Sequence, residues 1–456
     1  MESTNKMADE PVKKLLLSMG IPIIFSMMLQ ALYNIVDSAF VSNMKGCGEA
    51  ALNALTLAFP VQMLMVAIGI GTGVGVNALI AQCLGQNDRQ RASHSAGNAL
   101  FLGFIIYFVF LIFGLFGTDF YVRSQSHNPQ IITMASQYLK ICCIASFGIV
   151  FYSLYEKIIQ ATGRSMYTTI AQVSGAVLNM ILDPILIYGL CGLPALGVNG
   201  AAIATVLGQI CSFVLDFYFH YQYDHEISND LKYLKPNARI IKQIYAIGFP
   251  AIVAQALMSV MTYALNVIFG MVDERIVTAY GLYYKIQQFV LFAAFGLRDA
   301  ITPIVSFNYG LQNKKRIKDG IKYGLIYTLV IMLIGFGTLE LSARAFTTIF
   351  GLSGQTASLC ESAMRIISVS FMFAGANIAM QGCFQALENG ISSLIISLLR
   401  QFLLVIPVAY ILAKLVMIYN MPYWILWFTF IFAEGVSAFV AFILLKRTIV
   451  IKIEDK

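Results

Sequence analysis

The chain has 456 residues, of which 59% are hydrophobic and only 12% are charged. An average soluble protein has about 25% charged residues, so this composition excludes a soluble globular domain. The formal net charge is +7, but the basic residues are spread over the ends of apolar segments, which argues against nucleic-acid binding.

The N-terminus is polar as far as Val12, and a long apolar run follows Lys13 and Lys14. This run is too long for a cleaved signal peptide and has no small-residue cleavage site, so we expect it to remain. Twelve apolar runs can each cross about 30 Å of hydrocarbon. They cover residues 15–42, 51–83, 94–117, 130–160, 166–188, 197–221, 243–271, 276–309, 320–341, 356–387, 391–416 and 423–445. Because a backbone in lipid must satisfy its own hydrogen bonds, we predict an all-α integral membrane protein with twelve transmembrane helices.

The second half of the chain repeats the first. Four segments recur in the same order: Met19-Gly20-Ile21-Pro22 as Ile247-Gly248-Phe249-Pro250, Gly85–Arg91 as Gly310–Arg316, Gln160-Ala161 as Gln385-Ala386, and Asp183-Pro184 as Ile406-Pro407. We therefore predict an N-terminal lobe over 1–221, a connecting loop over 222–242 and a C-terminal lobe over 243–456. Six spans is an even number, so the two copies have the same orientation. Two similar bundles with a seam between them favour a transporter that works by alternating access.

The distribution of basic residues predicts the topology. Eighteen Lys and Arg residues lie at the termini and in the even-numbered loops, against five in the odd-numbered loops. The positive-inside rule therefore places both termini and the 222–242 loop in the cytoplasm.

Sequence motifs for cofactors and enzymes are missing. The eight cysteines and four histidines have no spacing suited to zinc or haem. A Walker A motif is also absent, so we expect no cofactor, no enzyme activity and transport driven by an ion gradient. Four glycines at alternate positions of the second span do not match a dinucleotide-binding motif, and close helix packing or a flexible kink is the better explanation. They are Gly69, Gly71, Gly73 and Gly75.

Ionisable groups are costly inside a membrane, so each one needs a reason. In the first half these are Asp37, Glu156 and Asp183. Asn179 lies one helical turn before Asp183, and Pro184 directly after it should free a backbone carbonyl. Carboxylate, amide and carbonyl oxygens suit Na⁺, or a group that exchanges protons. Three side chains could assist or have other roles: Thr205 could add a hydroxyl, Asp37 could cap a kink, and Glu156 could pair with Lys157 or Lys140.

The second half has a different set of charges within its spans. Arg298, Asp299, Arg400 and Glu434 form a possible polar network. Arg298 and Asp299 are neighbours in sequence and should not face each other on a helix, so we expect their partners to be Glu434 and Arg400. A structural ion-pair network is favoured over a second coupling or substrate site. The high Phe, Tyr and Met content would suit a cavity for varied organic cations.

Three segments resemble the multidrug and toxic compound extrusion (MATE) family, and within it the bacterial MepA-type branch. They are Gln160-Ala161-Thr162-Gly163, Asn179–Gly189 and Gly197–Ala202. The resemblance covers essentially the whole chain. It implies two six-helix lobes in a V, a central cavity open to one side at a time, and export of organic cations in exchange for H⁺ or Na⁺.

The resemblance also implies roles for individual residues. The first-helix acid of the family falls on Asp37, the fifth-helix Asn and Asp fall on Asn179 and Asp183, and the fourth-helix polar position falls on Glu156. The sixth-helix Thr falls on Thr205, and the acids of helices eight and twelve fall on Asp299 and Glu434. The seventh-helix Glu of the NorM-type branch has no counterpart, since Met258 stands there. The second QxxG signature is degraded to Gln385–Gly390, so we favour the first-lobe cluster as the coupling site.

Our hypothesis from the sequence is a secondary antiporter that expels organic cations and drugs. H⁺ or Na⁺ binds at the N-lobe carboxylates, with Na⁺ possible at Asp37, Asn179 and Asp183, and helix movement occurs at Pro22 and Pro184. We expect a monomer surrounded by lipid in a bacterial plasma (inner) membrane. Two alternatives are a lipid-linked oligosaccharide or lipid flippase of the same superfamily and, from another class, an intramembrane transferase.

Overall fold

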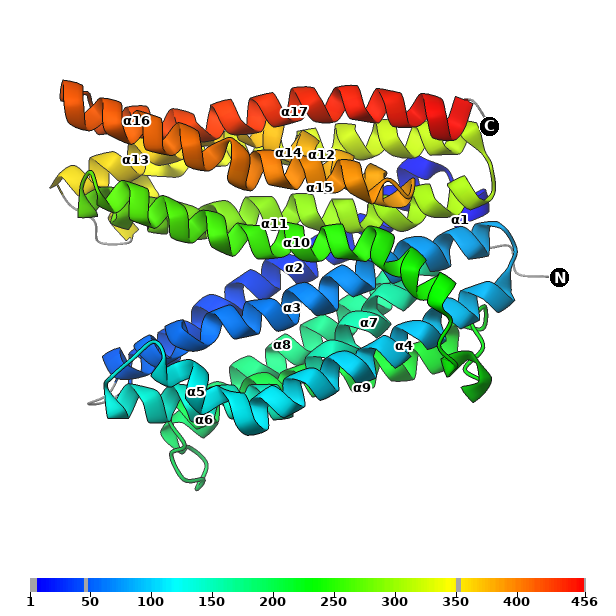
Figure 1. The fold of residues 1–456 in the computed structure, drawn as a ribbon, viewed down its shortest axis with the longest axis horizontal. Coiled ribbons are helices and arrows are strands. Elements are labelled where there is room, and N and C mark those ends of the chain that lie inside the picture. The colour runs from blue at the N-terminus through cyan, green and yellow to red at the C-terminus, as the bar shows by residue number, and fades with distance from the viewer. Residues whose placement is uncertain (1–5, 45–47, 350–353, 455–456) are drawn as a thin grey trace. The chain divides into compact units, whose positions relative to one another are not determined.

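The computed structural model describes residues 6–44, 48–349 and 354–454, and within them the regular elements are all helices. Ten helical segments are long and apolar enough to cross a membrane, and two bent helix pairs bring the number to twelve. The twelve predicted spans are thus confirmed. Figure 1 shows long helices that run roughly parallel within each part of the chain.

The first six spans occupy residues 12–223. Their elements are α2 (Val12–Ser42), α3 (Gly48–Gly85), α4 (Arg89–Ile112) with η1 (Phe113–Gly117) and α5 (Thr118–Arg123), α6 (Pro129–Ile144) with α7 (Phe147–Ala161), α8 (Ser165–Tyr188) and α9 (Val198–Tyr223). A short helix, α1 (Lys6–Asp9), precedes them, and the 3₁₀ helix η2 (Leu231–Leu234) lies in the connector.

The last six spans occupy residues 238–454. Their elements are α10 (Ala238–Gly270), α11 (Glu274–Gly310), α12 (Lys314–Ile349), α13 (Gly354–Ser368) with α14 (Phe371–Ala386), α15 (Gly390–Leu398) with η3 (Leu399–Leu403) and α16 (Val405–Tyr419), and η4 (Tyr423–Trp427) with α17 (Phe428–Ile449) and η5 (Val450–Glu454).

The internal repeat is visible in the backbone as well as in the sequence. The fourth span of each half is broken at corresponding places, with a bend of 46° between α6 and α7 and of 51° between α13 and α14. Corresponding turns also share a left-handed residue, Asn87 in one and Gln312 in the other, each with φ of 58°. The next residue in each case caps the following helix, since Asp88 accepts a hydrogen bond from the Arg91 amide and Asn313 from the Arg316 amide.

Packing divides the chain into two compact units. Unit 1 contains residues 1–8 and 25–252, and unit 2 contains residues 9–24 and 253–456. The division falls inside α2 and α10, so each of these helices contributes one part to each unit. The connector that follows α9 belongs to unit 1. The sequence placed the lobe boundaries at 221/222 and 242/243. They remain a prediction, because the two packing units are divided within α2 and α10 and not in the connecting loop.

In unit 1, glycines allow close contact between helices. A Cβ atom at Gly75 of α3 would lie 2.1 Å from the carbonyl oxygen of Ile244 in α10, and one at Gly71 would lie 2.7 Å from the Ile252 amide nitrogen. At Gly73 it would meet the Lys157 side chain of α7 at 2.7 Å. At these three glycines α3 therefore packs closely against its neighbouring helices, as the sequence predicted.

The core of unit 2 includes several buried aromatic side chains. Trp427, Phe371 and Tyr280 are fully buried in a cluster contributed by α10, α11, α12, α13, α14, α16, η4 and α17. The Tyr280 ring stacks on Phe430 at a centroid distance of 5.6 Å. The Trp427 indole donates a hydrogen bond to Ser362 of α13, so its polar atom is satisfied inside the cluster.

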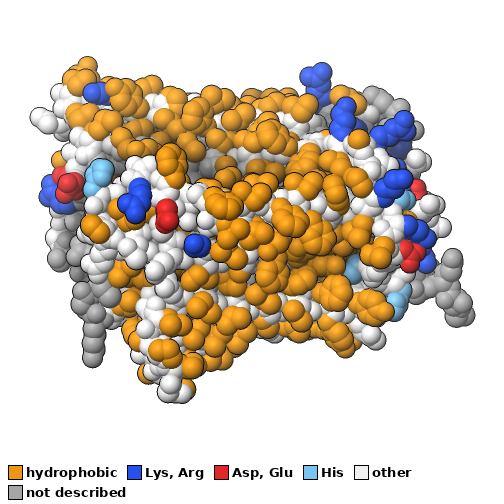
Figure 2. Space-filling model, turned by 60° about the horizontal axis from the view of Figure 1, so that its bottom comes forward, with side chains coloured by type: hydrophobic (Ala, Val, Ile, Leu, Met, Phe, Trp, Pro, Cys, Tyr) orange, Lys and Arg blue, Asp and Glu red, His pale blue; other side chains and the backbone are white. Residues whose placement is uncertain are grey.

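Many large apolar side chains are exposed along the spans, among them Phe108, Ile334 and Phe439. On the face shown in Figure 2, apolar side chains cover the middle, and charged side chains gather mainly toward two opposite ends. A surface of this kind suits hydrocarbon in the middle and water at the ends.

Candidate cation-binding site

The centre of the candidate site is a pair of carboxylates on two helices of unit 1. Asp37 comes from α2 and Asp183 from α8, and the two are close enough to interact electrostatically. Asp183 is completely buried, and Asn179, one turn earlier on α8, is 3% exposed. Asn179 Nδ2 donates toward Asp183 Oδ1 and toward Thr205 Oγ1 of α9, each at 3.5 Å. Four of the five predicted coupling residues are therefore brought together.

The polar atoms of this site are incompletely satisfied. Among the described side chains, Asp37 Oδ1, Asp183 Oδ2 and Asn179 Oδ1 are buried without a hydrogen-bond partner. A buried carboxylate without a partner is unfavourable unless it takes up a proton or a cation. The three oxygens thus form an acceptor-rich site suited to a small positive species.

Glycines in the neighbouring helices position these side chains. A Cβ atom at Gly208 of α9 would approach the Gly175 carbonyl oxygen of α8 to 2.7 Å and the Asn179 Cβ to 3.1 Å. The two helices can therefore approach closely where Asn179 meets Thr205. Tyr33, which interacts electrostatically with both acids and hydrogen-bonds to Gln30, completes the surroundings on α2. Gln30 in turn accepts a hydrogen bond from Gln172 of α8 at 3.2 Å.

Glu156, the fifth predicted residue, has other partners. On α7 it lies 3.3 Å from the Lys157 ammonium and accepts a hydrogen bond from Gln160 at 2.8 Å. Pairing with Lys157, which the sequence left open as an alternative, is the arrangement found. Glu156 also interacts electrostatically with Asp216 of α9, a residue that our sequence analysis missed.

Asp216 is one of several buried polar residues on α9 that the sequence analysis did not single out. His220 and Asp224 follow it at intervals of four, and all three are at most 2% exposed. The signal was in the sequence, because an i, i+4 series beginning near Thr205 marks one helix face.

In unit 2 the predicted polar network consists of two ion pairs. The Arg298 guanidinium donates to Asp299 Oδ1 at 2.8 and 2.9 Å, so the expectation that these neighbours need distant partners was wrong. A long guanidinium side chain can curl around the helix to reach the adjacent residue. Arg400 instead pairs with Glu434 at 2.7 Å. Asn377 of α14 also donates to Glu434, at 2.8 Å.

The two predicted hinge prolines both lie inside helices. Pro22 is in α2 and Pro184 is in α8. Pro22 belongs to the part of α2 that packs in unit 2, whereas Asp37 belongs to the part that packs in unit 1. Hinge motion at either proline stays a prediction.

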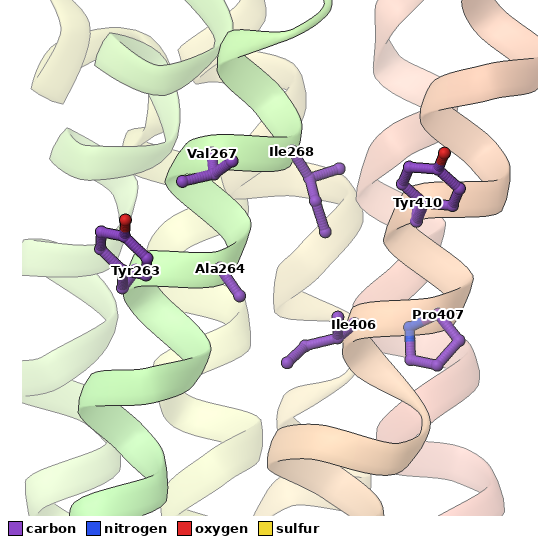
Figure 3. Close-up of a pocket in the computed structure, with 7 residues that line it drawn as sticks. All are labelled: Tyr263, Ala264, Val267, Ile268, Ile406, Pro407 and Tyr410. Carbon is purple, nitrogen blue, oxygen red and sulfur yellow. The ribbon is translucent and has the colours of Figure 1, made fainter.

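Unit 2 has an apolar groove between α10 and α16, of about 520 Å³. Figure 3 shows Ala264, Ile268 and Ile406 pointing into the space between the two helices, with Pro407 beside it. In the internal repeat, Ile406-Pro407 corresponds to Asp183-Pro184. The position of the acid in the first half is thus apolar in the second. Among the described residues, no group of three or more His, Cys, Asp and Glu side chains could hold a metal ion.

Comparison with known proteins gives consistent results for the whole chain. A model of the MatE family matches residues 22–185 and 250–411. Multidrug export protein MepA of Staphylococcus haemolyticus is 23% identical over 433 residues, which cover 95% of this chain and 93% of that protein. MepA of Staphylococcus aureus strain MRSA252 is 25% identical over 411 residues, which cover 89% of this chain and 88% of that protein.

Solved structures match at 25% identity over 99% of both chains. A crystal structure of MATE in complex with MaL6 has a TM-score of 0.92, and an outward-facing multidrug resistance MATE family transporter of the MOP superfamily has 0.91. A third, with a TM-score of 0.90, is a MOP superfamily transporter from Pyrococcus furiosus, described as having a binding pocket of reverse polarity that suggests a different function.

Proposed function

Because the chain belongs to the MatE family, we propose that it is a secondary active exporter of lipophilic organic cations, driven by exchange for H⁺ or Na⁺. The family and the all-helical fold agree with the expectation from sequence. Multidrug export is the activity named for the MepA relatives, and assigning it to this chain is part of the proposal.

The observation that carries the proposal is the Asp37–Asp183 pair. Two interacting carboxyl groups inside membrane spans, with buried oxygens that lack protein partners, are expensive to maintain for structure alone. An ion-coupled transporter needs a group of this type, which can accept one positive species and release it for another.

Coupling requires that the ion and the drug favour different conformations. In our proposal, H⁺ or Na⁺ binds at the Asp37–Asp183 pair and repacks α2, whose two parts belong to different units. Pro22 supplies a weak point in that helix because it removes one backbone hydrogen bond. Exchange of one H⁺ for one monovalent cation moves no net charge, so each pH unit supplies about 1.4 kcal/mol.

The test is efflux of the ethidium cation from proteoliposomes under separately imposed pH and sodium gradients. Wild-type protein should transport under at least one gradient, and Asp183→Asn and Asp37→Asn should lose most of that transport. Asp119→Asn, which changes an exposed carboxylate of α5, is the matched control and should transport normally. Wild-type flux in Asp183→Asn would refute the assignment of the site.

The other expectations also belong to the proposal. They are a transporter and not an enzyme, a monomer in the bacterial plasma membrane, and both termini in the cytoplasm. The flippase alternative gains no support from the MepA relatives. If the same vesicles transported a fluorescent lipid and not ethidium, the result would favour the flippase alternative.

A further inference from the structure

A line of small and polar residues runs along one face of α9. Thr205 begins it, and Gly208, Ser212, Asp216, His220 and the C-capping residue Asp224 follow at intervals of three or four residues. From Gly208 onward every member is buried. At 1.5 Å per residue the line is about 28 Å long, close to the thickness of the hydrocarbon core. We call it the α9 polar line.

One end of this line is the cation-binding site, where Thr205 meets Asn179. The other end lies at the connecting loop over 222–242, which we call the polar connector. There Asp224 accepts hydrogen bonds from Thr162 at 2.7 Å and from Arg164 at 3.1 Å. The positive-inside prediction places this end in the cytoplasm. The line therefore extends from the proposed coupling site toward one aqueous face.

Asp216, in the middle of the line, has an unusual environment. It is fully buried, and among the described residues neither of its carboxyl oxygens has a hydrogen-bond partner. An ionised carboxylate in this position would be strongly unfavourable. A carboxyl group that is kept without a partner but beside other ionisable groups is suited to binding and releasing a proton.

The groups around Asp216 come from α9 and α7. Glu156 and Tyr152 of α7 and Asp224 interact with it electrostatically. Glu156 is held by Lys157 and Gln160. Two other helices, α8 and α6, also pack against α9, and each carries one charged side chain, Asp183 and Lys140 respectively.

His220 connects Asp216 to the polar connector. It lies one turn after Asp216, its Nδ1 is 3.0 Å from Asp224 Oδ2, and its Nε2 is 2.8 Å from Asn229 Oδ1. An imidazole with an oxygen at each nitrogen can hold two protons and pass one on. Cβ atoms at i and i+4 are about 5–6 Å apart, so one water can bridge the polar ends of two such side chains.

We propose that Asp216 is a second proton-binding site, and that His220 and Asp224 exchange its proton with the aqueous face at the polar connector. The imidazole first gives its Nδ1 proton to Asp224 or water, and it then takes up, through a bridging water, the proton that leaves the Asp216 carboxyl, so no other reactant is consumed. This inference rests on the proposed function, because a second proton-binding site has a use only in a transporter driven by H⁺. It assigns no Na⁺ to Asp216.

The test is pH-driven ethidium transport by the full-length protein in proteoliposomes, with proton movement followed by trapped pyranine. Asp216→Asn keeps the size of the side chain but cannot carry the proton, so we expect it to lose most of the proton flux. Ethidium binding in detergent should stay close to wild type. His220→Gln should slow the flux and shift its pH profile, whereas Asp216→Glu should restore part of it.

The outcomes separate this inference from the proposed function. Wild-type protein that fails to couple ethidium to a pH gradient would overturn the inference, and a sodium-driven flux would still support the antiporter. Suppose that wild-type protein couples ethidium transport to a pH gradient and Asp183→Asn does not. If Asp216→Asn and His220→Gln then both keep the wild-type proton flux and pH profile, the inference is overturned and the proposed function stands. Asp119→Asn is again the control for removal of a carboxylate.

Discussion

At the scale of single residues, the site depends on charge that the protein leaves unbalanced. Lys157 and Gln160 hold Glu156, and Arg400 holds Glu434, so these acids have partners. Asp183 interacts electrostatically with Asp37 and accepts a hydrogen bond from Asn179, and each acid retains an oxygen without a protein partner among the described residues. In our proposal the acids with partners have structural roles, whereas the unbalanced pair exchanges cations.

The Arg400–Glu434 pair gives a prediction of stability. Both side chains are largely buried, at 6% and 14% exposure. Arg400→Met leaves the Glu434 charge uncompensated and should destabilise the protein by about 3–5 kcal/mol. The double variant Arg400→Met/Glu434→Gln should recover much of that loss. Thermal unfolding in detergent measures both, and additive losses in the double variant would show that the pair does not act as a unit.

An exposed residue gives a prediction of pH dependence. Asp273 caps α11, and hydrogen bonds from the Arg275 side chain and amide lower the pKa of Asp273 from 3.8 to about 2. The stabilisation is therefore complete above about pH 4 and is lost as the pH falls toward 2. Melting curves between pH 5 and 2 should show a smaller decline for Asp273→Asn than for wild type. Parallel curves would contradict this.

At the scale of helices, glycines decide how closely the spans of unit 1 pack. The sequence alone suggested this for α3, because Gly71, Gly73 and Gly75 fit no ligand-binding motif. It also predicted the Asn179–Asp183 arrangement, since side chains four apart share a helix face. The approach of Asp37 to Asp183 is a tertiary feature that spacing within one helix does not supply.

Substitution of Gly75 tests the packing directly. A Cβ atom there would lie 2.1 Å from the Ile244 carbonyl oxygen, and backbone cannot move aside as a side chain can. Gly75→Ala should therefore destabilise the protein by about 1–3 kcal/mol. Gly337→Ala in α12 is the matched control, because a Cβ atom there has nothing within 4 Å. Equal melting temperatures for the two variants would contradict the packing argument.

Three features of the helices and turns were not predicted from the sequence, and each has a physical reason. Arg298 and Asp299 pair because the guanidinium is long and flexible, which helix spacing does not reveal. Glu388 has φ of 55° at the position where Gly163 has φ of 86°, so the degraded second signature keeps its turn despite losing its glycine. His220 was overlooked because it lies near the end of α9, where polar residues are common, and Asp216 because no sequence motif includes it.

At the scale of the whole molecule, the two halves share an architecture and differ in chemistry. Bent spans and left-handed turns recur at matching places. The acid of α8, in contrast, corresponds to an apolar position beside the groove of α16. The repeat was predictable because four short sequence segments recur in the same order in the second half. We interpret the first half as the ion-binding half of the proposed antiporter.

The central claim is that ion and drug compete through the Asp37–Asp183 pair. The most direct test measures ethidium affinity of the purified full-length protein from pH 5 to 9, with and without Na⁺. Binding should weaken as H⁺ or Na⁺ rises, and Asp183→Asn should remove most of that dependence while Asp119→Asn keeps it. An affinity that ignores both ions in the wild type, or an unchanged dependence in Asp183→Asn, would contradict the account.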